Sequence, residues 1–541
     1  MLSKIIFYNL KHRKNVYKNR RTKGKIIMQK RRVSISVFQL LIAVLIIIAI
    51  IITIIIVRKN FNFQQIIIAK ELGDFSGSGT LEDPYKINKI EDLVKLAQNV
   101  NTGNSYSNKY FELVNKLDFK DDASYEKPNN KYGDLNKDGN IETIKTELTT
   151  GRGFETIGDS EEHPFEGTFK GNDNTIKNLL ISVNGEEKIF AGFFGNNKGT
   201  ISNLKISGNI TLDENVENKE IYIGMLIAKN EGLIQASTVE GNINATSQNK
   251  NNTIKVGGIT AENTGKIVDS ASNINITASQ LKAGISAKNL VVDNIEDSGE
   301  IINCTNNGNI KEDTASEHYT AGIVADNQGG NITSCTNNGE IIGKNVGGIA
   351  GKTKGYIVAC QNTGNISNVK VDSDNTETAG GIAGILDISK IENCKNTGNI
   401  SGLTNVGGIV GENKGTIGQS RNEGKISKVE DVIAKTSNIG GVIGKNNPTA
   451  KLIDSKNFGE ISSATDTLVN LGGICGILYN TSVIEKCENN GRVSGSAKII
   501  TPNEDVNEKC ISCVNNSGGI VNNADFGELN IGIIYGKFEE K

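Results

Sequence analysis

The stretch Cys304-Thr-Asn-Asn-Gly308 is one of seven copies of a short phrase in this chain of 541 residues. A second phrase alternates with it and has two glycines between apolar residues, as in Val346-Gly-Gly-Ile349. Self-similarity of this kind is typical of a stacked array, in which each repeat is one supersecondary unit. The other copies of the first phrase begin at Cys335, Cys360, Cys394, Ser420, Ser455 and Cys487, and those of the second begin at Ala379, Val406, Ile439 and Leu471.

The repeats have the pattern of strands and turns. Successive copies of the first phrase begin 25 to 35 residues apart, and no repeat contains an apolar stripe of helix length. The apolar residues come instead in short runs bounded by Asn and Gly, which are strand and turn signals. The shortest interval fits three strands of ~5 residues and three corners. We therefore predict an all-β fold, a parallel β-helix over residues 151–520 in which each coil pairs with its neighbours.

Such a coil stacks equivalent positions about 4.8 Å apart. The third residue of every copy is Asn, so we predict a ladder of hydrogen-bonded amides. The first residue is Cys or Ser, and serine replaces cysteine without any partner changing, so we predict free buried thiols rather than disulfides. The predicted ladder positions are Asn306, Asn337, Asn362, Asn396, Asn422, Asn457 and Asn489, with Cys304, Cys335, Cys360, Cys394 and Cys487.

A looser form of the pattern begins earlier, at Ala191-Gly-Phe-Phe-Gly195-Asn-Asn-Lys-Gly-Thr-Ile201. The order Gly-aliphatic-x-Gly followed by Asn-x-Gly-x-Ile resembles the GLUG-motif repeats of bacterial cell-surface proteins. The segment Gly77-Ser-Gly-Thr-Leu-Glu-Asp-Pro84 is similar to a lead-in that is common in that family. The resemblance covers roughly residues 77–520. It implies a repeat fold and a place at the cell surface, but no particular activity, because the motif occurs in proteins of several kinds.

The N-terminal region predicts a membrane anchor. The segment Val33–Val57 has no charged residue and is long enough to cross a bilayer. It also exceeds the ~7–15 apolar residues of a signal peptide. Residues 1–32 contain 12 Lys and Arg and no acidic residue, which predicts a basic cytoplasmic tail. We expect a single-pass cell-membrane protein with a linker over 58–76 and an extracellular C-terminal domain; Met28 stays open as an alternative start.

The part of the chain outside the membrane is then acidic, with 47 Lys and Arg against 61 Asp and Glu. This charge disfavours nucleic acid as a partner.

Between the anchor and the repeats, residues 77–150 are predicted to form an N-terminal cap. There Asn88-Lys-Ile-Glu91 has the pattern of a capping box, followed by a helix with Ile90, Leu93, Val94, Ala97 and Val100 on one face. Such a helix would cover unpaired strand edges, and residues 521–541 are expected to cap the other end.

The sharpest local motif is Asp134-Leu-Asn-Lys-Asp-Gly-Asn-Ile141. Oxygen donors at alternate positions and Gly at the sixth position are typical of calcium loops. The twelfth position is Lys145, where a complete EF-hand has an acidic residue. We predict a structural Ca²⁺ site, with a plain acidic turn as the alternative; its ligands would be Asp134, Asn136, Asp138 and Asn140.

Few residues of the sequence suggest catalysis or metal binding. The sequence contains no Gly-x-Ser-x-Gly, His-Glu-x-x-His or phosphate loop, and only three histidines. Cys510-Ile-Ser-Cys513 has metal-ligand spacing but lacks the second pair that a structural zinc site uses. We therefore predict no catalytic residues and no enzyme. Acidic pairs in the long insertions between repeats leave a polysaccharide lyase or hydrolase as an alternative function. These pairs are Asp372 with Asp374, Glu430 with Asp431, and Glu504 with Asp505.

The function expected from these features is display at the cell surface. A stiff β-helix rod would hold a loop-lined edge away from the membrane for an extracellular glycan or a matrix or host protein. The protein would then act as an adhesin or in the cell envelope. A pilin-like surface subunit is a third alternative, because Ser36-Val-Phe-Gln39 faintly resembles a prepilin stretch.

Overall fold

The structure is a computed structural model. It describes residues 75–119, 153–183, 189–213, 216, 220–312, 318–369, 377–429, 436–463, 469–479 and 481–495, with short backbone strands as far as residue 539. All of these residues belong to one compact unit, residues 64–541. The predicted tail and the anchor Val33–Val57 lie outside the described residues. Among the residues that are described, no helix is long and apolar enough to cross a membrane.

The coils between residues 300 and 479 each contain five short strands, whereas those between residues 168 and 290 contain four. In one coil, a strand with Ile357 is followed by two strands around Gly364 and then by two strands around the Gly-Gly pair. The strands are β30 (Ile357–Val358), β31 (Gln361–Asn362), β32 (Ile366–Asn368), β33 (Thr378–Gly380) and β34 (Ala383–Leu386). The next coil begins with β35 (Lys390–Glu392), which pairs in parallel with β30. The prediction of three strands in each coil was therefore wrong, because the coil has four sides and the glycine of the first phrase divides one of them into two strands.

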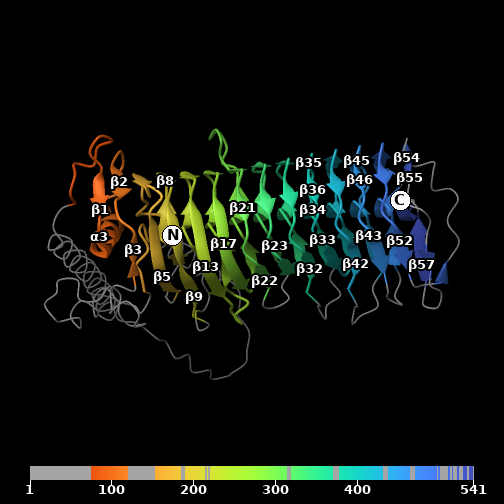
Figure 1. Cartoon of the computed structure of the whole chain (residues 1–541), viewed down its shortest axis with the longest axis horizontal. Helices are drawn as coiled ribbons and strands as arrows, with labels where there is room; N and C mark the ends of the chain where they lie inside the picture. Colours follow the sequence, from red (N-terminus) through yellow and green to blue (C-terminus); the bar gives the residue numbers. More distant parts are fainter. Residues whose placement is uncertain are drawn as a thin grey trace, which may run out of the picture. The chain divides into compact units, whose positions relative to one another are not determined.

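Equivalent strands of successive coils make four parallel sheets (Figure 1). Sheet A has 14 strands, from β1 (Tyr85–Ile87) to β54 (Cys510–Ile511), and includes β30. Sheet B contains β31 and β32, sheet C contains β34, and sheet D contains β33. In Figure 1 the coils follow one another in sequence order, and contacts between strands are mostly those of one coil with the next. The fold is an all-β solenoid of the β-helix kind.

Most of the variation in repeat length comes from one corner of the coil, between sheets B and D. Between β27 (Ile341–Gly343) and β28 (Asn345–Gly347) this corner is a single residue, Lys344. Between β32 and β33 it holds residues 369–377, and between β42 (Ile426–Lys428) and β43 (Ser437–Gly440) it holds residues 429–436. The predicted excursions with acidic pairs at 372–374 and 430–431 are inserted at this corner, and their acidic residues lie outside the described part.

The repeated glycines allow neighbouring coils to stack closely. A Cβ atom on Gly364 would lie only 1.9 Å from the backbone oxygen of Gly339, the equivalent glycine of the preceding coil. No side chain fits there, so the last position of the first phrase must be Gly. Inside the coil, the apolar positions hold fully buried isoleucines such as Ile357, Ile366 and Ile382. Each such side chain contributes about 1.5–3 kcal/mol by leaving water.

A helix precedes the regular coils, as the sequence predicts. Helix α3 (Ile90–Asn101) buries Leu93, Val94, Ala97 and Val100. Its N-cap is Lys89, and the Asp92 carboxylate accepts hydrogen bonds from the backbone N–H groups of Asn88 and Lys89, at 2.8 and 3.2 Å. The predicted capping box with Asn88 and Glu91 was thus wrong by one residue, because Asp92 rather than Glu91 faces back toward the start of the helix.

The other end of the solenoid continues the same sheets. The segment predicted as a C-terminal cap contains β57 (Glu528–Gly532) and β58 (Tyr535–Glu539). The first pairs with β48 (Val469–Gly472) of sheet D and the second with β49 (Cys475–Tyr479) of sheet C. These residues therefore add strands in the register of the preceding coil.

Candidate functional site: buried ladders and the outer polar rows

The asparagines of the first phrase form a continuous ladder inside the solenoid. Each side chain donates from Nδ2 to Oδ1 of the equivalent residue in the next coil, and all six of these bonds measure 2.7–2.8 Å. Each Nδ2 also donates to the carbonyl of the glycine two residues on, at 2.8–3.0 Å. The ladder, fully buried at every position, is Asn306, Asn337, Asn362, Asn396, Asn422, Asn457 and Asn489.

The Gly-Gly pairs face this ladder across the interior of the coil. A Cβ atom on Gly348 would lie 2.4 Å from Cγ of Asn362, and one on Gly381 would lie 2.4 Å from Cγ of Asn396. The second glycine of each pair therefore leaves the space that the amide of the next coil occupies. The two repeated phrases are parts of one arrangement, since larger side chains at the glycine row would push the amide row out of register.

The cysteines form a second buried row. The backbone N–H of Cys304 donates to Sγ of Cys335 at 3.4 Å, and that of Cys335 donates to Sγ of Cys360 at 3.3 Å. Ser420 continues the row, because its Oγ accepts from the backbone N–H of Cys394 at 3.2 Å. The six described cysteines are free thiols. Burial raises the pKa of the Cys487 thiol to about 12, so this thiol stays protonated and unreactive at neutral pH.

A second amide ladder follows the corner between sheets C and A, and the sequence analysis did not predict it. Asn197, Asn230, Asn263 and Asn289 each donate to the equivalent residue of the next coil at 2.8–2.9 Å, ending at Asn327. Its signal in the sequence is the repeated Asn-x-Gly of the earlier coils, which we interpreted only as a turn. The row changes to Thr353 in the next coil, so no single phrase marks it along the whole chain.

The outer surface of sheet B carries exposed amides in the first and central coils. Asn242 donates to Asn209 at 3.1 Å, and Asn275 donates to Asn242 at 3.4 Å. A neighbouring row continues through later coils with bonds of 2.7–2.8 Å. We call this surface the amide face; it consists of Asn209, Asn242, Asn273, Asn275, Asn307, Asn338 and Thr363.

The same surface becomes charged farther along the chain. Lys395, Arg421 and Lys456 occupy one row of sheet B. Glu423 pairs with Lys395 at 3.0 Å and also with Arg421, and Lys456 pairs with Glu488 at 2.9 Å. Sheet B therefore presents mainly amides over one group of coils, with the exposed Glu240 and Lys311 among them, and a network of ion pairs over the next.

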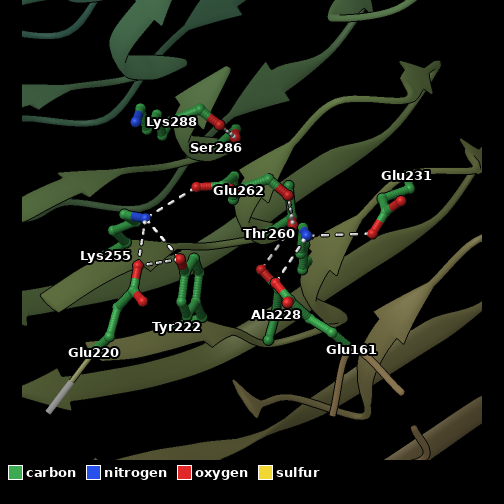
Figure 2. A network of polar contacts seen from close by, with 11 residues as sticks. Glu161, Glu220, Tyr222, Ala228, Glu231, Lys255, Thr260, Glu262, Ser286 and Lys288 are labelled. Carbon is green, nitrogen blue, oxygen red and sulfur yellow. Dashed lines mark hydrogen bonds and ion pairs between the residues drawn. The ribbon is translucent and has the colours of Figure 1, made fainter. Parts of the chain in front are cut away.

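Sheets C and D carry a polar cluster that the sequence did not reveal (Figure 2). Lys255 on β14 (Thr253–Gly257) donates to the Tyr222 hydroxyl and to the Glu262 carboxylate, both at 2.9 Å. It also lies 3.4 Å from Glu220 and 4.1 Å from the centre of the Tyr222 ring. Burial, with a hydrogen bond to Glu220, raises the pKa of the Tyr222 phenol well above its ordinary value. Because carboxylates flank the ammonium on both sides, this cluster joins sheets D and C electrostatically.

Glu262 also belongs to a row of alternating charge on sheet C. It lies beside Lys229 in one neighbouring coil and Lys288 in the other, and the row continues to Asp326 and Lys352. Opposite charges directly across a strand pair contribute roughly 0.2–1 kcal/mol, whereas like charges destabilise the pairing. The alternation therefore favours this order of coils, and no short motif in the sequence indicates it.

Several predicted sites fall outside the described residues. These include the calcium ligands Asp134, Asn136, Asp138 and Asn140, as well as Cys513. Within the described ranges, no group of three or more His, Cys, Asp or Glu residues is placed to hold a metal ion. The calcium site, the membrane anchor and the lack of catalytic residues stay predictions.

Comparison with known proteins gives one short family match and two partial similarities. Halomucin from Haloquadratum walsbyi is 30% identical over 113 residues, which are 21% of this chain and 1% of that protein. A structure of a candidate immunoglobulin A1 protease from Bacteroides ovatus is 14% identical; the match covers 82% of this chain and 86% of that one, with a TM-score of 0.26. The family described as the GLUG motif matches residues 375–401. This match confirms the resemblance to GLUG-motif repeats that the sequence predicts, and the chain is a repetitive β-solenoid that is similar to that family.

Proposed function

We propose that this protein is a surface-displayed solenoid that binds an extended, uncharged polysaccharide along its amide face. Cell-surface placement is supported by the resemblance to GLUG-motif proteins and by the apolar segment Val33–Val57, which we propose as the anchor. The observation that carries the binding proposal is the set of exposed asparagines that neighbouring coils hold in place through side-chain hydrogen bonds.

The chemistry of these amides fits a sugar chain. A primary amide has two N–H donors and a carbonyl with two lone pairs, so one bond in each direction along a ladder leaves capacity for further hydrogen bonds. Because the ladders already restrict the side chains, binding costs less conformational entropy than it would with independent residues. The strand spacing of about 4.8 Å also offers the same groups again at each coil, as a repeating polymer requires.

The charge pattern favours a neutral polymer over an acidic one. The central row of the amide face holds Asn307, Asn338 and Thr363. The charged residues of sheet B at later coils are paired with one another. An acidic polysaccharide would find few cations on the amide face, and the whole region outside the proposed anchor is acidic. The proposed role is adhesion to, or organisation of, a glycan layer, without catalysis.

The test is binding of the full-length chain in detergent to immobilised neutral and acidic polysaccharides. We expect retention by an extended neutral polysaccharide, and a loss of about tenfold or more in affinity for the double variant Asn307→Asp/Asn338→Asp. Two lost hydrogen bonds of about 1 kcal/mol each account for that loss.

The matched control is Asn331→Asp, an exposed position beside sheet A, which should bind normally. Equal binding by the double variant and the control would contradict the assignment of the face. If only matrix proteins retain the protein, its partner is a matrix protein and not a glycan. New reducing or unsaturated ends in the polysaccharide would show that the protein is an enzyme.

A further inference from the structure

Lys282 and Glu312 form a fully buried pair whose charged atoms are too far apart for a hydrogen bond. Lys282 Nζ lies 3.8 Å from Glu312 Oε1, and both side chains are 0% exposed. Burial removes the hydration of both ions, and only excellent geometry recovers that loss. A contact longer than the usual 2.7–3.2 Å does not provide such geometry. The direct contact between these two groups therefore recovers only part of that loss.

The surroundings hold both groups in position. Lys282 Nζ donates to the backbone oxygen of Gln280 at 2.6 Å. The other carboxylate oxygen of Glu312, Oε2, accepts the backbone N–H of Lys344 at 2.8 Å. A Cβ atom on Gly343 would lie only 3.1 Å from this oxygen, so the carboxyl group is packed closely from that side as well. The amine and the carboxyl group thus face each other in a dry, restricted site.

We propose that Lys282 and Glu312 condense to an intramolecular amide bond. In this reaction the Nζ–Cδ bond forms, the Cδ–Oε1 bond breaks, and Oε1 leaves as water with two protons that the amine supplies. Oε2 remains as the amide oxygen and keeps the hydrogen bond from Lys344. The reaction requires no oxidant or cofactor, and it replaces two buried charges with one neutral group that can hydrogen-bond.

The bond would join neighbouring coils of the solenoid. Lys282 lies on β18 (Leu281–Ala283) of sheet D, and Glu312 is the last residue of β22 (Ile310–Glu312) in sheet B. The strand that follows, β23 (Tyr319–Ala321), pairs with β18 through Thr320 and Lys282. A cross-link here closes a loop of one coil at the corner where residues 313–317 are inserted. It thereby prevents separation of these two coils under load, independently of any ligand on the amide face.

The experiment is mass spectrometry of the purified full-length chain and of the variant Lys282→Arg, which keeps the positive charge but cannot form this amide. After correction for the substitution, we expect the wild type to be lighter by the mass of one water molecule. A tryptic digest should contain a branched peptide that joins the segments with Lys282 and Glu312, without cleavage after Lys282. Circular dichroism shows whether the variant is folded.

The cluster around Lys255 supplies the matched control in the same digest. Lys255 lies closer to a carboxylate, 2.9 Å from Glu262, but both side chains are 11% exposed and accessible to water. We expect its peptides to be unlinked. A wild-type mass that equals the variant's corrected mass, with unlinked peptides at Lys282 and Glu312, would overturn the proposal even if Lys282→Arg does not fold.

Discussion

The first coils and the central coils fill their interiors in different ways. The first coils use aromatic rings: Phe193 and Phe194 have ring centres 5.0 Å apart, and Phe165 lies 5.1 Å from Phe194. No phenylalanine occurs between Phe194 and Phe458, and the central coils stack isoleucine, asparagine and glycine at equivalent positions. Irregular coils next to a helix leave spaces of different shapes that large rings fill. Identical coils leave identical spaces, which identical small residues fill with hydrogen bonds along the axis.

The largest expected effect is in the aromatic region. Replacing the fully buried Phe193 by alanine removes a ring that contacts Phe154, Phe169 and Phe194. We expect a loss of about 3–5 kcal/mol in the free energy of unfolding, measured by chemical denaturation. The control is Phe458→Ala, because Phe458 is exposed and contacts Arg421. Similar losses at Phe193 and Phe458 would remove the distinction between the two regions.

The next effect tests the ladder of the central coils. Asn362→Ala leaves the acceptor on Asn396 and the carbonyl of Gly364 without their donor, and removes the acceptor of Asn337. We expect the free energy of unfolding, measured by chemical denaturation, to fall by about 2–4 kcal/mol. Each buried polar group left without a hydrogen-bond partner costs about 1–3 kcal/mol. The control is the exposed Asn365 in the same coil. Its replacement by alanine should lower the free energy of unfolding by less than about 1 kcal/mol. Equal costs would mean that stacking of isoleucines alone holds these coils together.

The smallest effect concerns the thiol row. Serine occupies the same row at Ser420 and Ser455, so Cys487→Ser should change stability by less than about 1 kcal/mol at neutral pH. At alkaline pH the wild type should lose stability faster than the variant. The folded pKa of Cys487 is about 12 against an ordinary value of 9.0, so the stabilisation is complete below pH 9.0 and is lost as pH rises toward about 12.

The free energy of unfolding should fall by about 1.4 kcal/mol per pH unit for each thiol that ionises only in the unfolded chain. Thermal unfolding of both proteins between pH 8 and 11 measures the difference. Parallel stability curves for the wild type and Cys487→Ser would contradict the burial of this thiol.

The predictable part of the candidate site is the part that repeats. Asn306, Asn337 and Asn362 could be placed in one row because the same residue returns once in each coil, and a parallel stack brings such residues into contact. The amide face was not predicted, since its rows change between Asn, Thr and charged residues from coil to coil. The cluster of Lys255, Tyr222 and Glu262 was also missed, because its members come from different sheets and occur once.

Period, turn residues and apolar runs were enough by themselves to determine a parallel solenoid with its asparagines superposed and a helix before its coils. This is so because the distance between identical residues along the chain is the length of one coil. Only the tertiary structure decided that each coil has four sides, that the glycine pairs make room for the amide of the next coil, and that Lys282 meets Glu312. Those contacts depend on where the corners turn, and the corner between sheets B and D changes length from coil to coil without disturbing the stack.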